Sequence, residues 1–126
     1  MAYAKGFYYK PGIDFAMLQQ YHEGLFISDG CMLSRVSRAI VNDDLDSAYE
    51  WERKLIEIFG KDNVLSEIHT WQFCNPKTEE QVNLNNAMQK TDLFKLKIAK
   101  DLGIKIIAAN DAHYAKREDW QWHELE

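Results

Sequence analysis

The chain has 126 residues, a formal net charge of −5 and a composition that is 46% hydrophobic and 28% charged. This composition is typical of one ordinary globular domain and excludes a disordered tail, because it provides enough apolar side chains for a folded core. The acidic balance creates no global positive field, so a role with nucleic acid requires a metal ion or a larger partner to supply positive charge.

The cysteines and the apolar runs indicate in which cellular compartment the chain is expected. Cys31 and Cys74 lie far apart and neither belongs to a CxxC pair, which indicates neither a disulfide framework nor a zinc finger. No apolar run approaches the ~20 residues that a membrane span needs. We therefore expect a reducing compartment, a cytoplasmic chain and no membrane contact.

The first third of the chain predicts short elements. Asp14 is suited to cap a short helix that reaches about His22. Residues 25–28 (LFIS) then form a short apolar strand, and residues 32–41 form a second short helix. The chain thus begins with brief helices on either side of one strand.

Two longer helices are predicted at residues 44–59 and 79–102, and Gly60 and Gly103 follow them as stop signals. Their apolar side chains recur at steps of three or four, which is the helical period. The stripe of the first is Leu45, Ala48, Trp51, Leu55 and Ile58. The stripe of the second is Leu84, Ala87, Met88, Thr91, Phe94, Ile98 and Leu102.

Residues 25–28, 64–68 and 104–109 all read as short buried strands, and helix-sized segments separate them. Strands joined by such crossovers must run parallel, and helices must cover at least one side of their sheet. The predicted fold class is therefore α/β, with the strands side by side in sequence order and the two long helices on the outer face. A last short helix is expected at residues 118–125.

Potential metal ligands follow each predicted strand. In parallel α/β folds, ligands and catalytic residues collect at the carboxyl ends of the strands. Asp29 and Cys31 follow the first strand, Glu67 and His69 end the second, and Asp111 and His113 follow the third. Because side chains alternate along extended chain, Asp111 and His113 should project to the same side and present two ligands to one ion.

Each candidate also has a structural interpretation. A carboxylate in a buried strand, such as Glu67, needs a partner or a site because burial without one is costly. His22 at a helix end interacts favourably with the helix dipole, and Cys74 receives no role. The remaining alternatives are a turn at Asp29-Gly30, a small buried hydrophobe at Cys31, a surface or hydrogen-bonded histidine at His69, and a cap or loop turn at Asn110-Asp111.

The joint pattern favours a metal site over these separate structural roles. Three successive strands bring cysteine, glutamate, aspartate and histidine to one edge. Residues that serve only to pack a hydrophobic core are not expected to show this pattern. Together these donors suit zinc or manganese better than magnesium. Metal-assisted hydrolysis by a bound, activated water is the chemistry that follows.

Several blocks resemble, in order and spacing, the PHP (polymerase and histidinol phosphatase) domain of the bacterial and phage DNA polymerase III alpha subunit. They are GFYYKPGID (residues 6–14), EGLFISDGC (23–31), IFGKDN (58–63), the Glu67-Ile68 pair, DLGIKIIA (101–108), NDAHY (110–114) and the stretch from Glu118 to His123. The resemblance covers nearly the whole chain. Several ungapped blocks in one order are more specific than any single motif.

The resemblance implies a distorted (β/α)7 barrel with a cluster of two or three metal ions at its carboxyl rim, for which the donor types favour zinc or manganese. It maps metal ligands onto Cys31, Asp111 and His113, while Glu67 and His123 match family positions without a role carried over. Members of this type are metal-dependent 3′–5′ exonucleases or, where ligands are lost, structural parts of the replicative polymerase. Both a phosphoesterase site and a non-catalytic, partner-binding remnant therefore remain open.

The chain departs from the family pattern at both ends. The family places a His-x-His motif, further histidines and a glutamate before the GFYYKP block, where this chain begins, and polymerase domains after the point where it ends at HELE. We expect the C-terminal half of one incomplete PHP domain over residues 1–126, inactive alone. Its expected partners are a missing N-terminal half, the remaining polymerase domains and, through them, DNA. An unrelated amidohydrolase-type barrel would leave the GFYYKP and EGL blocks unexplained.

Overall fold

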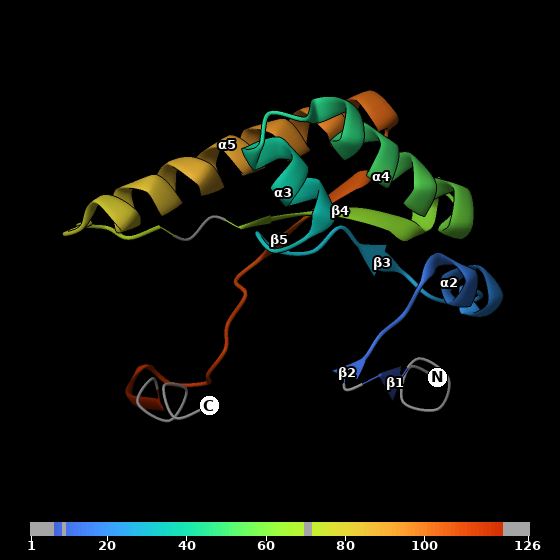
Figure 1. Cartoon of the computed structure of the whole chain (residues 1–126), viewed down its shortest axis with the longest axis horizontal. Coiled ribbons are helices and arrows are strands. Elements are labelled where there is room, and N and C mark those ends of the chain that lie inside the picture. The colour runs from blue at the N-terminus through green and yellow to red at the C-terminus, as the bar shows by residue number, and fades with distance from the viewer. Residues whose placement is uncertain (1–6, 9, 70–71, 120–126) are drawn as a thin grey trace.

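The computed structural model describes residues 7–8, 10–69 and 72–119 (Figure 1). The strands are β1 (Phe7–Tyr8), β2 (Lys10–Pro11), β3 (Ile27–Ser28), β4 (Val64–His69) and β5 (Lys105–Ala109). The helices are α2 (Phe15–Tyr21), α3 (Arg35–Val41), α4 (Leu45–Phe59) and α5 (Glu79–Leu102), with short 3-10 turns at η1 (Lys61–Asn63) and η2 (Arg117–Asp119). Most of the helix expected at residues 118–125, with His123, lies outside the described residues.

A three-stranded sheet forms the centre of the fold, in the order β3-β4-β5 with both pairs parallel. The register aligns Ser28 with Leu65 and His69 with Ala109. This confirms the prediction of parallel strands side by side in sequence order. β3 begins two residues later than expected, because the N–H of Leu25 donates to the carbonyl of His22 in a turn instead of joining the sheet.

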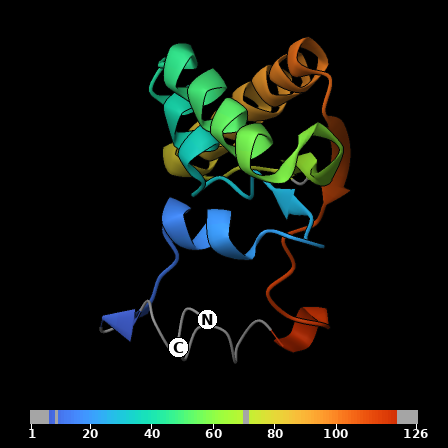
Figure 2. The same cartoon turned by 90° about the vertical axis from the view of Figure 1, so that its right-hand side faces the viewer.

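Three helices, α3, α4 and α5, lie together over one face of the sheet, and α2 lies outside this layer near β3 (Figures 1 and 2). It contacts α4 through the stacked rings of Phe15 and Trp51. The two long helices occupy the predicted segments, and Gly60 and Gly103 follow them with φ of 80° and 68°. The cap predicted for the first short helix is confirmed: the Asp14 carboxylate accepts a hydrogen bond from the N–H of Met17. The second short helix begins later than predicted because Ser34 caps it by accepting from the N–H of Ser37.

The core fills the space between the helix layer and the sheet in two clusters. The first lies among α3, α4 and α5 and contains Val36, Ala39, Ile40, Ala48 and Ile98. The second joins the ends of α4 and α5 to the sheet and contains Ile58, Phe59, Val64, Ala99 and Ile104. None of the described helices is long and apolar enough to cross a membrane.

The expectation of three buried strands is wrong for β5. Ile104, just before the strand, is buried, but Ile106 is 43% exposed and Lys105 and Ala108 are exposed too. The physical reason is position: within the described sheet β5 is the outer strand and has a neighbour, β4, on one edge only. An apolar run predicts a strand but does not predict how many neighbours will cover it.

Substituting Gly103 with alanine should lower the free energy of unfolding by about 1 kcal/mol, because Gly103 ends α5 in the left-handed region that L side chains disfavour. The added methyl group would also lie 3.1 Å from Nζ of Lys61. Urea denaturation checks this, with Lys100→Ala at the exposed end of the same helix as the control. A Gly103→Ala chain as stable as that control would contradict the prediction.

Candidate functional site at the carboxyl edge of the sheet

The parallel sheet brings the loops after β3 and β5 and the last residues of β4 to one edge. The loop after β3 enters beside β4, where the N–H of Asp29 donates to the carbonyl of Leu65 at 3.1 Å. His69 ends β4 and aligns with Ala109, the last residue of β5. The candidate residues thus share an edge, as the sequence predicted. Their side chains differ, however, in how deeply they are buried and in which groups they contact.

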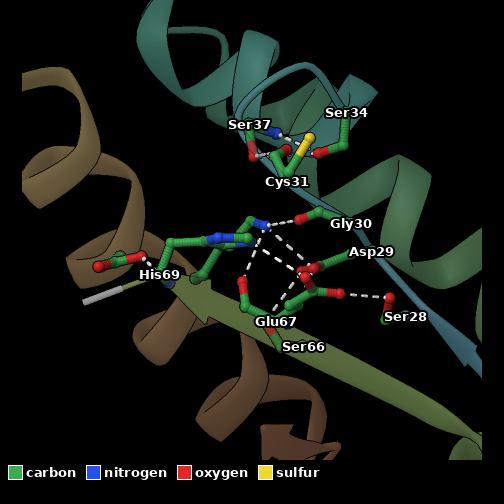
Figure 3. Close-up of polar contacts among 11 residues, drawn as sticks. Ser28, Asp29, Gly30, Cys31, Ser34, Ser37, Ser66, Glu67 and His69 are labelled. Atoms are coloured by element: carbon green, nitrogen blue, oxygen red, sulfur yellow. Dashed lines mark hydrogen bonds and ion pairs between the residues drawn. The ribbon is translucent and has the colours of Figure 1, made fainter. Parts of the chain in front are cut away.

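Asp29 is a buried structural residue and not merely a turn residue. Its carboxylate accepts hydrogen bonds from Oγ of Ser66 at 2.9 Å and from the N–H of Glu67 at 2.8 Å (Figure 3). It also forms an ion pair with Nζ of Lys95 at 3.0 Å. These partners satisfy a charge that would otherwise be costly to bury.

Lys95 is a partner that the local sequence patterns did not reveal. Its side chain is 1% exposed, and its ammonium also donates to the carbonyls of Gly30 at 2.6 Å and Glu67 at 3.0 Å. One signal was available: Lys95 falls four residues after Thr91 and three before Ile98, within the apolar stripe of α5. A lysine in such a stripe predicts a buried cation, and a buried cation requires an anionic partner.

Glu52 of α4 is buried in the same region, with 0% exposure, and neither of its carboxylate oxygens accepts a hydrogen bond from the described residues. Burial, and then a hydrogen bond that the protonated carboxyl donates to the Asp29 carboxylate, raise the pKa of Glu52 to about 9, although the Lys95 ammonium acts in the opposite direction. Glu52 is therefore protonated near neutral pH. The two charges that remain in this buried region, the Lys95 ammonium and the Asp29 carboxylate, then cancel each other.

Glu67 and His69 form a second polar pair. Glu67 accepts a hydrogen bond from Oγ of Ser28 at 2.6 Å, and its other oxygen lies 3.0 Å from Nε2 of His69. The expectation that Glu67 needs a partner is thus confirmed. His69 is 4% exposed, so its interpretation as a surface histidine is wrong, and its Nε2 is close enough to Glu67 for an ion pair but not aligned as a hydrogen bond.

Cys31 lies half-buried where the loop enters α3. Its carbonyl accepts hydrogen bonds from the N–H of Ser34 and from Oγ of Ser37, both at 2.9 Å. These contacts fix the backbone of Cys31 at the start of the helix. The cysteine is therefore held at the edge where a ligand is expected.

Asp111 and His113 do not lie on extended chain, so the prediction that side-chain alternation places them on one side is wrong in its premise. The strand ends at Ala109, and Asp111 has φ of 49°, in the left-handed region. Side-chain alternation therefore does not continue through this segment. Both residues lie exposed beyond the end of β5.

The donor types on this edge fit zinc: a thiol, a carboxylate and an imidazole are ligands that zinc accepts. In the described ranges, however, no three histidine, cysteine, aspartate or glutamate side chains are grouped closely enough to hold an ion. Cys31, Asp111 and His113 therefore share an edge without forming a closed site, and their role as ligands stays a prediction. His22 fits its structural interpretation, because its Nδ1 lies 2.8 Å from the carbonyl of Gln19 and its ring contacts Phe59 edge-on.

Comparison with known proteins gives two consistent results. The family model of the PHP domain matches residues 1–71. The DNA polymerase III subunit alpha of Aquifex aeolicus is 35% identical over 123 residues, which are 98% of this chain and 10% of the relative. Those of Deinococcus radiodurans and Chlamydia pneumoniae are 35% and 32% identical and are matched over 97% and 99% of this chain, but 8% and 11% of their own lengths. The chain thus spans about a tenth of these relatives.

Proposed function

The chain belongs to the PHP domain family, and from this premise we propose that it forms part of a metal-dependent phosphoesterase site, of the 3′–5′ exonuclease kind, in a DNA polymerase III alpha subunit. The similarity to alpha subunits along nearly the whole chain supports this context. In this proposal residues 1–126 are one part of the PHP domain, in the cytoplasm. The other PHP segments, the polymerase domains and DNA are its partners.

The single observation that carries the proposal is the shared edge of the parallel sheet. Residues after β3 and β5 reach this edge with a thiol, a carboxylate and an imidazole. We assign Cys31, Asp111 and His113 to hold one zinc or manganese ion there, with further ligands supplied by other segments of the domain. A bound ion of this kind would activate a water and neutralise charge on the phosphoester.

Residues of this chain that do not bind the ion would shape its surroundings. Asp29 and Lys95 balance each other's charge beneath the loop that carries Cys31. Glu67 and His69 place a carboxylate and an imidazole next to each other at the end of β4.

A non-catalytic PHP remnant is the second candidate. The observation that favours it is that the most buried acid and base of this edge, Asp29 and Lys95, are used to hold the fold and not to face a ligand. In that case the chain would serve as a scaffold within a replication protein. Metal binding separates the two candidates.

The 126-residue chain should bind at most one zinc or manganese ion, weakly, and should hydrolyse DNA 3′ ends little or not at all. Asp111→Ala and His113→Ala should each weaken binding by at least ~10-fold, because loss even of groups that orient ligands costs ~10–100-fold. Isothermal calorimetry on the wild-type chain and both variants measures this.

Cys74→Ala is the matched control, because Cys74 is exposed and lies away from the proposed ligands in the sequence. Its affinity should equal that of the wild-type chain. Tight binding that is unaffected by Asp111→Ala and His113→Ala would exclude these residues as ligands. Strong exonuclease activity of the chain alone would show that no other segment is needed.

A further inference from the structure

We propose that Lys95 is a positioning residue that holds the loop after β3 in place against β4, and thereby places Cys31 for metal binding. This inference deepens the proposed function and rests on it for its metal-binding part. Its structural part, the fixing of the loop by one buried ammonium, stands on the contacts of Lys95 alone.

All the hydrogen-bonding capacity of Lys95 is used within this edge. An ammonium has three N–H donors, and Nζ of Lys95 has three oxygen partners at 2.6 to 3.0 Å: a carboxylate oxygen of Asp29 and the carbonyls of Gly30 and Glu67. Figure 3 labels the three partner residues, of which Asp29 and Gly30 belong to the loop after β3 and Glu67 belongs to β4. Two of the three partners are backbone groups, so the ammonium fixes the course of the chain and not only a charge.

The position of these partners explains why a side chain is needed there. β3 is two residues long, and its last backbone hydrogen bond to β4, in the described chain, runs from the N–H of Asp29 to Leu65. Beyond Asp29 the loop is joined to β4 through the Asp29 side chain and through Lys95. Gly30, whose carbonyl Lys95 holds, directly precedes Cys31.

A merely electrostatic role for Lys95 makes a different prediction from a positioning role. If Lys95 only neutralises Asp29, then the double variant Asp29→Asn/Lys95→Met, which removes both charges, should behave like the wild-type chain. If Lys95 positions the loop, the double variant should still lose the contacts to the carbonyls of Gly30 and Glu67. The double variant therefore separates the two roles and avoids leaving one buried charge unpaired.

The first measurement uses the metal-free chain and does not depend on the proposed function. Amide hydrogen exchange is compared for the segments that contain Asp29, Ser34 and Glu67, whose N–H groups are hydrogen-bonded at this edge. We expect exchange there to be at least ~10-fold faster in the double variant than in the wild-type chain, with exchange in the middle of α4 unchanged. Equal rates in these two chains would overturn the proposal.

The second measurement tests the link to the metal. Cobalt(II) is added to each chain in a Cys74→Ala background, so that Cys31 is the one remaining thiol and the thiolate-to-metal charge-transfer absorption reports whether it is a ligand. We expect this absorption in the wild-type chain and in Lys97→Met, which removes an exposed lysine from the same helix. In the double variant the cobalt affinity should fall by at least ~10-fold.

Each of the two measurements can contradict a different part of the proposal. If the wild-type chain shows no thiolate absorption while the exchange rates respond as expected, the metal-binding part and the assignment of Cys31 are wrong, but Lys95 still positions the loop. If the double variant binds cobalt as tightly as the wild-type chain, Lys95 does not place Cys31. If exchange is also unchanged, Lys95 serves only as the charge partner of Asp29.

Discussion

Replacing Lys95 with methionine should lower the free energy of unfolding by about 3–5 kcal/mol, which is the usual cost of removing one partner of a buried ion pair. Methionine fills much of the same space, so the loss comes from the interactions of the ammonium and not from a cavity. It would leave the Asp29 carboxylate buried without its cation, and the carbonyls of Gly30 and Glu67 without their shared donor.

Urea denaturation of the wild-type chain, Lys95→Met and Lys97→Met measures this effect. Lys97 is exposed on the same helix, so its substitution should change the free energy of unfolding by less than ~0.5 kcal/mol. The double variant Asp29→Asn/Lys95→Met should recover part of the loss, because no charge is left unpaired. A Lys95→Met chain as stable as Lys97→Met would mean that the buried ion pair contributes nothing to stability.

The second large effect concerns pH and Glu52. Its pKa is raised from 4.5 to about 9 in the folded chain, mainly by burial. Between these values the folded chain keeps a proton that the unfolded chain has lost. The contribution to stability is therefore fully present below about pH 4.5 and is lost as pH rises toward 9, by at most ~1.4 kcal/mol per pH unit.

Glu52→Gln should remove this dependence, because an amide does not ionise. The difference in unfolding free energy between the variant and the wild-type chain should shift by about 4 kcal/mol in favour of the variant between about pH 5 and pH 8. Urea denaturation across this range measures it. Glu57→Gln, at an exposed position of the same helix, should give a difference that hardly changes with pH, and a parallel response of the two variants would contradict the raised pKa of Glu52.

Local signals in the sequence predicted most of the architecture. Asp14 and Gly103 mark helix ends by rules that depend only on neighbouring residues, and both mark them in the structure. The separation of apolar runs by helix-sized segments was enough to predict parallel pairing in sequence order. The exposure of Ile106 could not be predicted in this way, because it depends on which neighbours β5 has in the sheet.

The candidate site was predictable to a smaller extent. The shared edge follows from parallel topology, but the partner of Asp29 lies 66 residues away and no local pattern joins the two. The available signals were a charged residue within each apolar helical stripe: Lys95 in α5 and Glu52 in α4. Two ionisable groups on the apolar faces of neighbouring helices together indicate a polar network between the helix layer and the sheet, because neither group can be buried cheaply alone.

The short length of β3 and its long-range tie to α5 have a consequence for how the molecule folds. A contact between residues 66 apart can form only after the chain between them, which includes α4 and β4, has been brought together at an entropic cost. We therefore predict that the contact between Lys95 and the loop forms after the transition state of folding. Its loss should then accelerate unfolding and leave the rate of folding nearly unchanged, so Lys95 would govern how long the folded edge persists and not how quickly it forms.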